Sequence, residues 1–308
     1  MGLEVPRTGE QRGASDRERL ESERGATTRE GPVAREQKPS VPGASETVSA
    51  ALFLICCTKH DHFGRSNVQA RREQTSSMDI DNDPTVLLAG ASGDTGRRVL
   101  YLLARSGLDV RAITTDPGNV GDLRRASADE VVVCDLFDRA DAERAVSGVD
   151  LILTTVGSTP QEVFLADELV DGTGNINLVE SAAAAGVERV VMESSLGVGG
   201  DRASAMARFF RLSIGPVVEA KTVAERAIRE SGMDYTIFRP GVLTTGAATD
   251  DAQVASAESG LWGAVSRADV ARLMLAAPFT PEATNRTLDV VRNPLLRNRS
   301  ERIDWRHP

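Results

Sequence analysis

Apolar and polar positions follow two different periods in the later part of the chain. Short apolar runs are typical of buried strands, and apolar residues spaced three or four apart are typical of helices packed on a core. The pattern predicts strands at 85–89, 110–114, 130–134, 151–156, 190–192, 235–238 and 286–291. It predicts helices at 95–105, 140–146, 163–185, 216–231 and 267–277. Because strands and helices alternate, we expect right-handed βαβ units and a parallel sheet.

The first predicted strand leads directly into the loop Gly90-Ala91-Ser92-Gly93-Asp94-Thr95-Gly96, and a helix follows. In such a unit the first glycine permits a tight turn, the second lets the backbone approach a pyrophosphate, and the third lets helix and sheet pack closely. The phosphates then meet free N–H groups at the positive end of the helix. A turn without a ligand is the alternative, but the order of elements favours a dinucleotide.

The predicted fold class is therefore α/β, a Rossmann-type doubly wound parallel sheet with three layers in a single domain. The expected cofactor contacts of its first loop are Gly90, Ser92, Gly93, Asp94, Thr95 and Gly96.

Further motifs follow in a fixed order: VVVCDL, GVERVVMESS, Lys221 shortly before AERAIRESGMDYTIFRPG, and SRADVARLMLAAP. Together with the glycine loop they resemble the atypical short-chain dehydrogenase/reductase group over about residues 85–292. That group includes NmrA-like proteins and NAD(P)H-binding reductases related to biliverdin and flavin reductases. The resemblance is specific for the superfamily and does not identify a substrate.

The resemblance implies cofactor contacts beyond the loop. Asp135 would accept a hydrogen bond from the adenine amino group and Leu136 would cover one face of the base, although an Asp here is also a favoured helix cap. Backbone after the fourth strand would line the cofactor ribose, and residues at the end of the sixth would meet the nicotinamide carboxamide. The residues in question are Thr155, Gly157, Pro240 and Val242.

The end of the second strand bears on the choice of cofactor. An acidic residue there would bind the ribose 2′-hydroxyl of NAD, and a basic one the 2′-phosphate of NADP. NADP-binding relatives commonly have Arg where Thr115 stands, and NAD-binding relatives have Asp where Thr114 stands. Threonine hydroxyls can donate to a phosphate and no carboxylate occupies the strand end, although Asp116 follows it. The sequence favours NADP, with NAD as the alternative.

The catalytic set of the family is incomplete. Its enzymes use a Ser and a Tyr-x-x-x-Lys motif, in which the Tyr moves the proton and the Lys binds the nicotinamide ribose. Ser195 matches the Ser, with Ser194 as its alternative, and Lys221 matches the Lys, but Val217 stands where the Tyr is expected. The plainer alternatives are a silent polar residue at the strand end and a solvated surface lysine.

The substrate region is expected to be small, because only about 25 residues separate Gly241 from Arg267. Segment 205–214 is predicted to cover the nicotinamide side as a lid. Within it, Arg208 and Phe209 suit a flat anionic acceptor such as a flavin or a quinone, through stacking and cation–π contact. An amphipathic helix that packs its phenylalanines into the core is the alternative.

Two functions fit these residues. The first is an NAD(P)H-dependent oxidoreductase without the Tyr acid, which reduces a small-molecule acceptor able to take its proton from water. The alternative is an NmrA-like redox sensor or assembly factor that binds NAD(P) without turnover. An epimerase or dehydratase acting on a nucleotide sugar is disfavoured by the missing Tyr and the short carboxyl-terminal region.

Charge is distributed unevenly. Residues 1–77 carry 12 Lys+Arg and 11 Asp+Glu, a net of +1, whereas residues 78–308 carry 24 and 34, a net of −10. The acidic part argues against nucleic acid as a partner. Lys221 is the single lysine of residues 78–308, against 23 arginines. A GC-rich genome and a halophilic source both explain that ratio.

Residues 1–77 have no sustained apolar period, so we expect a disordered or wrongly assigned extension, with Met78 as the natural start of the domain at 78–308. A regulatory tail is the alternative. The three cysteines have no metal or disulfide spacing and the histidines lie outside the predicted core, so no metal site is expected. The apolar run 50–57 is too short to cross a bilayer. These features predict a cytoplasmic protein without membrane insertion, and a homodimer is compatible with them.

Overall fold

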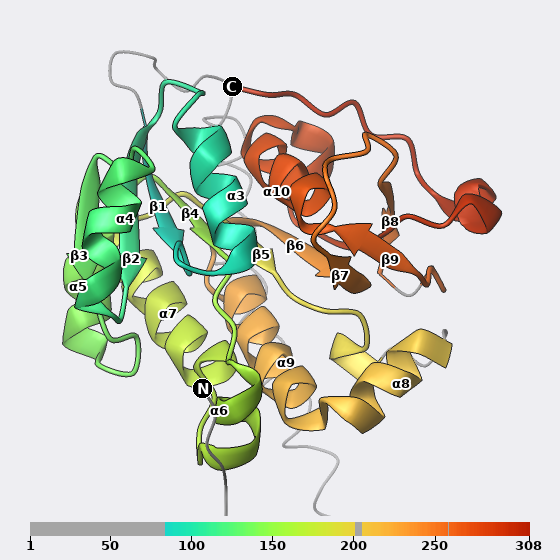
Figure 1. The fold of residues 1–308 in the computed structure, drawn as a ribbon, viewed down its shortest axis with the longest axis horizontal. Coiled ribbons are helices and arrows are strands. Elements are labelled where there is room, and N and C mark those ends of the chain that lie inside the picture. Colours follow the sequence, from blue (N-terminus) through green and yellow to red (C-terminus); the bar gives the residue numbers. More distant parts are fainter. Residues whose placement is uncertain (1–83, 201–204, 258) are drawn as a thin grey trace, which may run out of the picture. The chain divides into compact units, whose positions relative to one another are not determined.

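The computed structural model describes residues 84–200, 205–257 and 259–308 (Figure 1). The predictions for residues 1–77 lie outside this part of the chain. Every helix in the described part is too short or too polar to form a membrane span.

Eight of the described strands form one sheet in the order β3-β2-β1-β4-β5-β6-β10-β8. Neighbouring strands are parallel except for β10 and β8, which are antiparallel. The strand order reverses between β1 and β4, and ligands of open α/β sheets bind at the carboxyl ends of the strands beside such a switch point. The strands of this sheet are β1 Thr85–Ala89, β2 Asp109–Thr114, β3 Glu130–Val133, β4 Leu151–Thr154, β5 Arg189–Glu193, β6 Asp234–Pro240, β8 Gln253–Ser256 and β10 Arg286–Val291.

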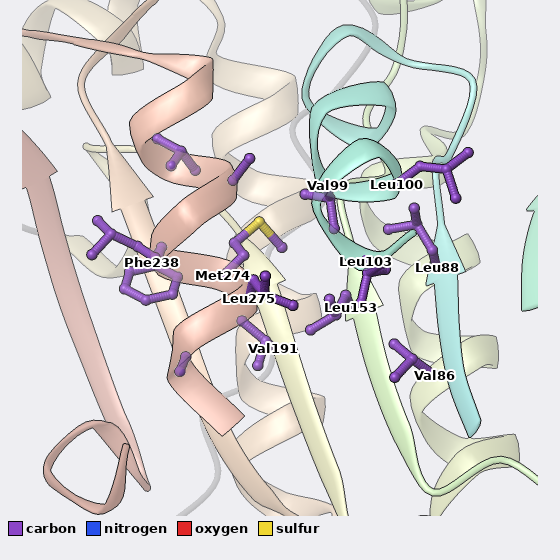
Figure 2. Packing of buried hydrophobic residues seen from close by; sticks show 14 of the residues in the cluster. Val86, Leu88, Val99, Leu100, Leu103, Leu153, Val191, Phe238, Met274 and Leu275 are labelled. Atoms are coloured by element: carbon purple, nitrogen blue, oxygen red, sulfur yellow. The ribbon is translucent and has the colours of Figure 1, made fainter. Parts of the chain in front are cut away.

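Helices cover both faces of the sheet, which confirms the predicted three-layered α/β fold (Figure 1). On one face α3 (Asp94–Leu103) and α10 (Arg267–Ala276) pack together, and Leu103 and Met274 are wholly buried there (Figure 2). The opposite face is covered by α5 Arg139–Val146, α7 Asn175–Ala185 and α9 Gly215–Glu230. The remaining α-helices are α4 Val120–Arg125, α6 Pro160–Leu165 and α8 Ala205–Ser213.

The prediction of one long helix at 163–185 is wrong. Helix α6 ends at Leu165, the backbone is extended at Ala166 and Leu169, and a π-helical turn, η2 (Val170–Gly174), precedes α7. A Cβ at Gly172 would lie 3.3 Å from Ala220 of α9, so this turn is shaped by close packing that a periodic pattern does not reveal.

Three short strands were not predicted. β7 (Val242–Thr244) and β9 (Ala264–Ser266) form a separate parallel pair, and β8 closes the edge of the large sheet. A strand of three residues is too short to display a period, so its identity depends on tertiary pairing.

Candidate functional site

The glycine loop joins β1 to α3 with the geometry expected of its sequence. Gly90 has a φ of 78°, and a Cβ there would lie 2.8 Å from the carbonyl carbon of Thr155. A Cβ at Gly96 would overlap the carbonyl oxygen of Gly90. These two glycines therefore allow the tight turn and the close approach of helix to strand.

The outer side of the loop is exposed at Gly93 and Asp94. Gly93 is exposed, and the first turn of α3 begins there without a side-chain cap. Ser92 is half-buried, Asp94 is exposed, and Arg97 Nε donates to the Ser92 carbonyl at 2.9 Å. Uncapped N–H groups and the helix dipole suit a pyrophosphate, so the loop fits the phosphates of a dinucleotide.

The end of β2 has one buried and one exposed threonine. The Thr114 hydroxyl is engaged locally: it accepts from the Asp116 backbone N–H at 3.3 Å and from Asn119 Nδ2 at 3.4 Å. Asp116 itself caps the following turn through the Gly118 N–H. Thr115 is exposed, so of the two threonines it is the one whose hydroxyl can meet a ligand.

The ends of β3 and β4 also face this edge of the sheet. Asp135 is exposed and its Oδ1 accepts from the Phe137 N–H at 3.0 Å, while Leu136 is buried. After β4, the Thr155 hydroxyl donates to the Gly90 carbonyl at 3.2 Å, and Gly157 is exposed. The sheet thus brings these predicted residues to the same edge as the loop.

Lys221 is buried between the ends of β4 and β5, so it is not a solvated surface lysine. Its Nζ lies 3.0 Å from Asp171 Oδ1 and donates to the carbonyls of Val156 and Glu193, each at 3.3 Å. The π-turn η2 supplies Asp171, and π-turns are frequent at functional sites. An ammonium is therefore fixed at the carboxyl ends of two strands next to the switch point.

Asp171 was not predicted, because it lay inside the supposed long helix. Burial raises the pKa of Asp171, but the Lys221 ammonium and the hydrogen bond from the Ser158 N–H outweigh burial and leave the pKa below its usual value. Asn175 Nδ2 donates to the Asp171 carbonyl, and Asn175 Oδ1 accepts from the Thr154 hydroxyl. These two hydrogen bonds fix the turn. The Asp171 carboxylate is thus ionised, and hydrogen bonds from Ser158 and Asn175 hold its turn in place.

The two candidate serines have different surroundings. Ser194 is buried and its Oγ donates to Glu225 Oε1 at 2.6 Å. Burial raises the pKa of Glu225, but Arg239 and Ser194 outweigh it and lower the pKa overall. Ser195 is half-buried and its Oγ donates to the Leu196 carbonyl at 3.1 Å. Ser194 belongs to an internal network, which leaves Ser195 as the candidate at the site.

Neither tyrosine of the chain lies beside Lys221. Val217 lies one turn before Lys221 on α9. Tyr101 is 58% exposed on α3 and accepts a hydrogen bond from Arg105, and Tyr235 lies at the amino end of β6, away from the carboxyl edge. The chain has two tyrosines, so no Tyr is placed beside Lys221.

Glu193, the last residue of β5, was also missed by the sequence reasoning. It is buried, and its Oε1 accepts from the Thr95 hydroxyl in the first turn of α3 at 3.1 Å. Burial raises the pKa of Glu193 to about 7, against the opposing effects of Lys221 and Thr95. The only signal in the sequence is an acidic residue at the end of an apolar strand.

The remaining predicted residues lie at the end of β6 and on α8. Pro240 is buried and Val242 is 41% exposed. On α8, Arg208 and Phe209 are exposed, whereas Phe210 packs against a small apolar cluster. The helix therefore both anchors itself and presents an aromatic ring to solvent.

Comparisons with known proteins agree with this geometry. A family model described as NAD(P)H-binding matches residues 90–281. An uncharacterized chloroplastic protein of Arabidopsis thaliana is 28% identical over 76% of this chain and 85% of its own length. Sanguinarine reductase of Eschscholzia californica is 26% identical over 68% of this chain and 89% of its own length. The photosystem II assembly factor Ycf39 of Cyanophora paradoxa is 26% identical over 50% of this chain and 44% of its own length.

Solved structures show the same fold. ChuY, an anaerobilin reductase from Escherichia coli O157:H7, matches with a TM-score of 0.59 and 26% identity, covering 68% of this chain and 98% of its own. A wide-type short-chain dehydrogenase/reductase from Veillonella parvula in complex with NADP matches with a TM-score of 0.57 and 14% identity. The match covers 71% of this chain and 98% of that structure's chain. The second likeness shows the fold alone.

Proposed function

The chain belongs to the NAD(P)H-binding family, and from that premise we propose that it is an NAD(P)H-dependent reductase of a flavin- or quinone-like acceptor. The observation that carries the proposal is the buried Lys221–Asp171 pair at the carboxyl ends of β4 and β5. The pair would hold the nicotinamide ribose, while Val217 leaves the site without the usual proton donor.

The dinucleotide would cross the carboxyl edge of the sheet with its pyrophosphate over Gly93 at the start of α3. Asp135 and Leu136 would contact the adenine, and Thr115 the adenosine ribose. Backbone at Thr155 and Gly157 would line the ribose on the other half. When bound, the cofactor supplies a hydride, and the chain supplies position and electrostatics.

The acceptor class follows from the missing acid. Alcohol–ketone chemistry needs a positioned proton donor, whereas a reduced flavin or quinone can take its proton from water. The exposed Phe209 and Arg208 on α8 would stack against such a flat ring. Two of the proteins similar to this chain are named as reductases, which supports a reductase but does not identify its acceptor.

The proposal is tested by steady-state oxidation of NADPH and NADH with a panel of flavins, quinones and simple ketones. We expect turnover with a flavin or a quinone and none with the ketones. Tight binding of the dinucleotide without oxidation by any flavin or quinone would contradict the reductase proposal.

That result would favour the second candidate, an NAD(P)-binding sensor or assembly factor. Its support is that Val217 stands where the family's Tyr is expected, and that the Ser194 hydroxyl is committed to Glu225. One relative of this chain is named as an assembly factor.

We further propose NADP as the preferred cofactor, because the strand end at Thr115 presents a hydroxyl and no carboxylate of its own. Titrations with NADP and NAD measure this preference.

The ratio of one lysine to 23 arginines in residues 78–308 supports a halophilic source, and the cytoplasm is the proposed compartment. Proposed partners are the small-molecule acceptor and a second copy in a homodimer, without nucleic acid or membrane insertion.

A further inference from the structure

Glu193 is a buried acid that the proposed function does not use. The residue is 7% exposed, and its carboxyl group accepts a hydrogen bond from the Thr95 hydroxyl of α3. Burying a carboxyl group is costly unless partners balance its negative charge or the group is protonated. Its position therefore calls for an explanation.

The sheet places this carboxyl group on the nicotinamide half of the crevice. The pyrophosphate of a dinucleotide lies at the start of α3, and the adenosine half extends over β2. The nicotinamide half must then extend in the opposite direction, over the ends of β4 and β5. Glu193 ends β5, and its side chain lies on the α3 side, one hydrogen bond from Thr95.

Two cations act on Glu193, and each of them has a carboxylate partner of its own. Lys221 of α9 donates to its backbone carbonyl, and Arg267 at the start of α10 lowers its pKa through space. Arg267 also forms an ion pair with the exposed Asp94, with 3.8 Å between Nε and Oδ2. Lys221 forms one with Asp171, with 3.0 Å between Nζ and Oδ1. Both cations thus have carboxylate partners of their own, and burial outweighs their effect on Glu193.

We propose that Glu193 discriminates between the two redox forms of the bound nicotinamide. The oxidised ring is a cation and the reduced ring is neutral. The ionised carboxylate favours the oxidised form, and the protonated carboxyl group favours the reduced form. This inference rests on the proposed placement of the cofactor, but not on the identity of any acceptor.

The test compares dissociation constants of NADP⁺ and NADPH by calorimetric titration from about pH 6 to about pH 8.5, a range that spans the transition of a group with a pKa near 7. Both forms share the adenine and phosphates, so their ratio cancels the titration of those groups. A cation within about 4–6 Å lowers a carboxyl pKa by about 1–3 units, so we expect the ratio to shift toward NADP⁺ by about tenfold as pH rises.

Glu193→Gln should make the ratio independent of pH, and the exposed control Glu219→Gln should leave its pH dependence unchanged. Thr95→Val removes the hydrogen bond that lowers the Glu193 pKa, so it should move the midpoint of the transition to higher pH. A flat ratio in the parent protein, or a pH-dependent ratio in Glu193→Gln, would overturn the inference. Neither result depends on acceptor reduction, which tests the proposed function separately.

Discussion

Lys221 is the single residue on which the cofactor assignment depends most, because its ammonium is fixed where the nicotinamide ribose would lie. Lys221→Met should weaken NADPH binding by about 1–3 kcal/mol, the scale of a hydrogen bond from a charged group. It also leaves Asp171 buried and unpaired, which should lower the free energy of unfolding by about 3–5 kcal/mol. Titration calorimetry and urea unfolding measure the two effects.

A second substitution separates binding from stability. Asp171→Asn in the Lys221→Met background removes the unpaired charge, so stability should recover in part while NADPH binding stays weak. If Lys221→Met bound NADPH as tightly as the parent, Lys221 would be a structural charge, and the non-catalytic function would become the better one.

Gly93 tests the phosphate position. It is exposed and has ordinary extended backbone, and a Cβ there would lie 3.3 Å from the Gly90 carbonyl oxygen, a contact that a small shift relieves. Gly93→Val should therefore fold, while its side chain occupies the volume proposed for the pyrophosphate. We expect dinucleotide binding to be abolished in a titration, with little change in melting temperature. Gly121→Val, at an exposed helical glycine with open space around it, is the matched control. Undiminished binding by Gly93→Val would place the cofactor elsewhere.

Among individual residues, the sequence predicted those that belong to a spaced motif, such as Gly90 and Lys221. It missed Asp171 and Glu193, because each becomes significant only through a partner distant in the chain. Asp171 pairs with a lysine fifty positions later, and Glu193 meets Thr95 on another element. Spacing within one segment carries no information about such contacts.

Among the elements, α8 is the one whose role can be tested most directly. Phe209 is 58% exposed and Leu212 is 89% exposed on the same helix. Phe209→Ala should raise KM for an aromatic acceptor by roughly fivefold, because a lost stacking contact is worth about 1 kcal/mol. The dissociation constant of NADPH should not change, and Leu212→Ala should change neither quantity. A KM unaffected by Phe209→Ala would remove α8 from the acceptor site.

Elements with a sustained period were predicted well, and irregular ones were not. The apolar period predicted where α9 begins and ends, with Pro216 in its first turn, because one face of the helix is buried along its length. The π-turn η2 and the strands β7 and β9 depend on packing and pairing with distant segments. Their local sequences therefore do not determine them.

For the whole molecule, stability should depend on pH in a way that identifies Glu193. Its folded pKa of about 7 exceeds the ordinary value of 4.5, so the stability it contributes is complete below 4.5 and is lost as pH rises through 7. The loss is on the order of 3 kcal/mol. Glu193→Gln should therefore lose less stability than the parent between about pH 5 and about pH 8 in urea unfolding. Parallel profiles for the two proteins would contradict this explanation.

The composition of residues 1–77 leads to a further prediction for the molecule. That segment has no sustained apolar face, so its deletion should leave the melting temperature and the dinucleotide affinity of residues 78–308 unchanged. Differential scanning calorimetry of the full and shortened chains makes the comparison. A clear loss of stability on deletion would show that the segment is part of the fold.

The most direct test of the central claim is a single turnover. The protein is mixed anaerobically with slightly less than one equivalent of NADPH, and a quinone is then added while the absorbance of the reduced nicotinamide is followed. The proposed reductase predicts that this absorbance is lost faster than in a mixture of NADPH and quinone without protein. A bound dinucleotide that stays reduced, or is oxidised no faster than in free solution, would contradict the claim.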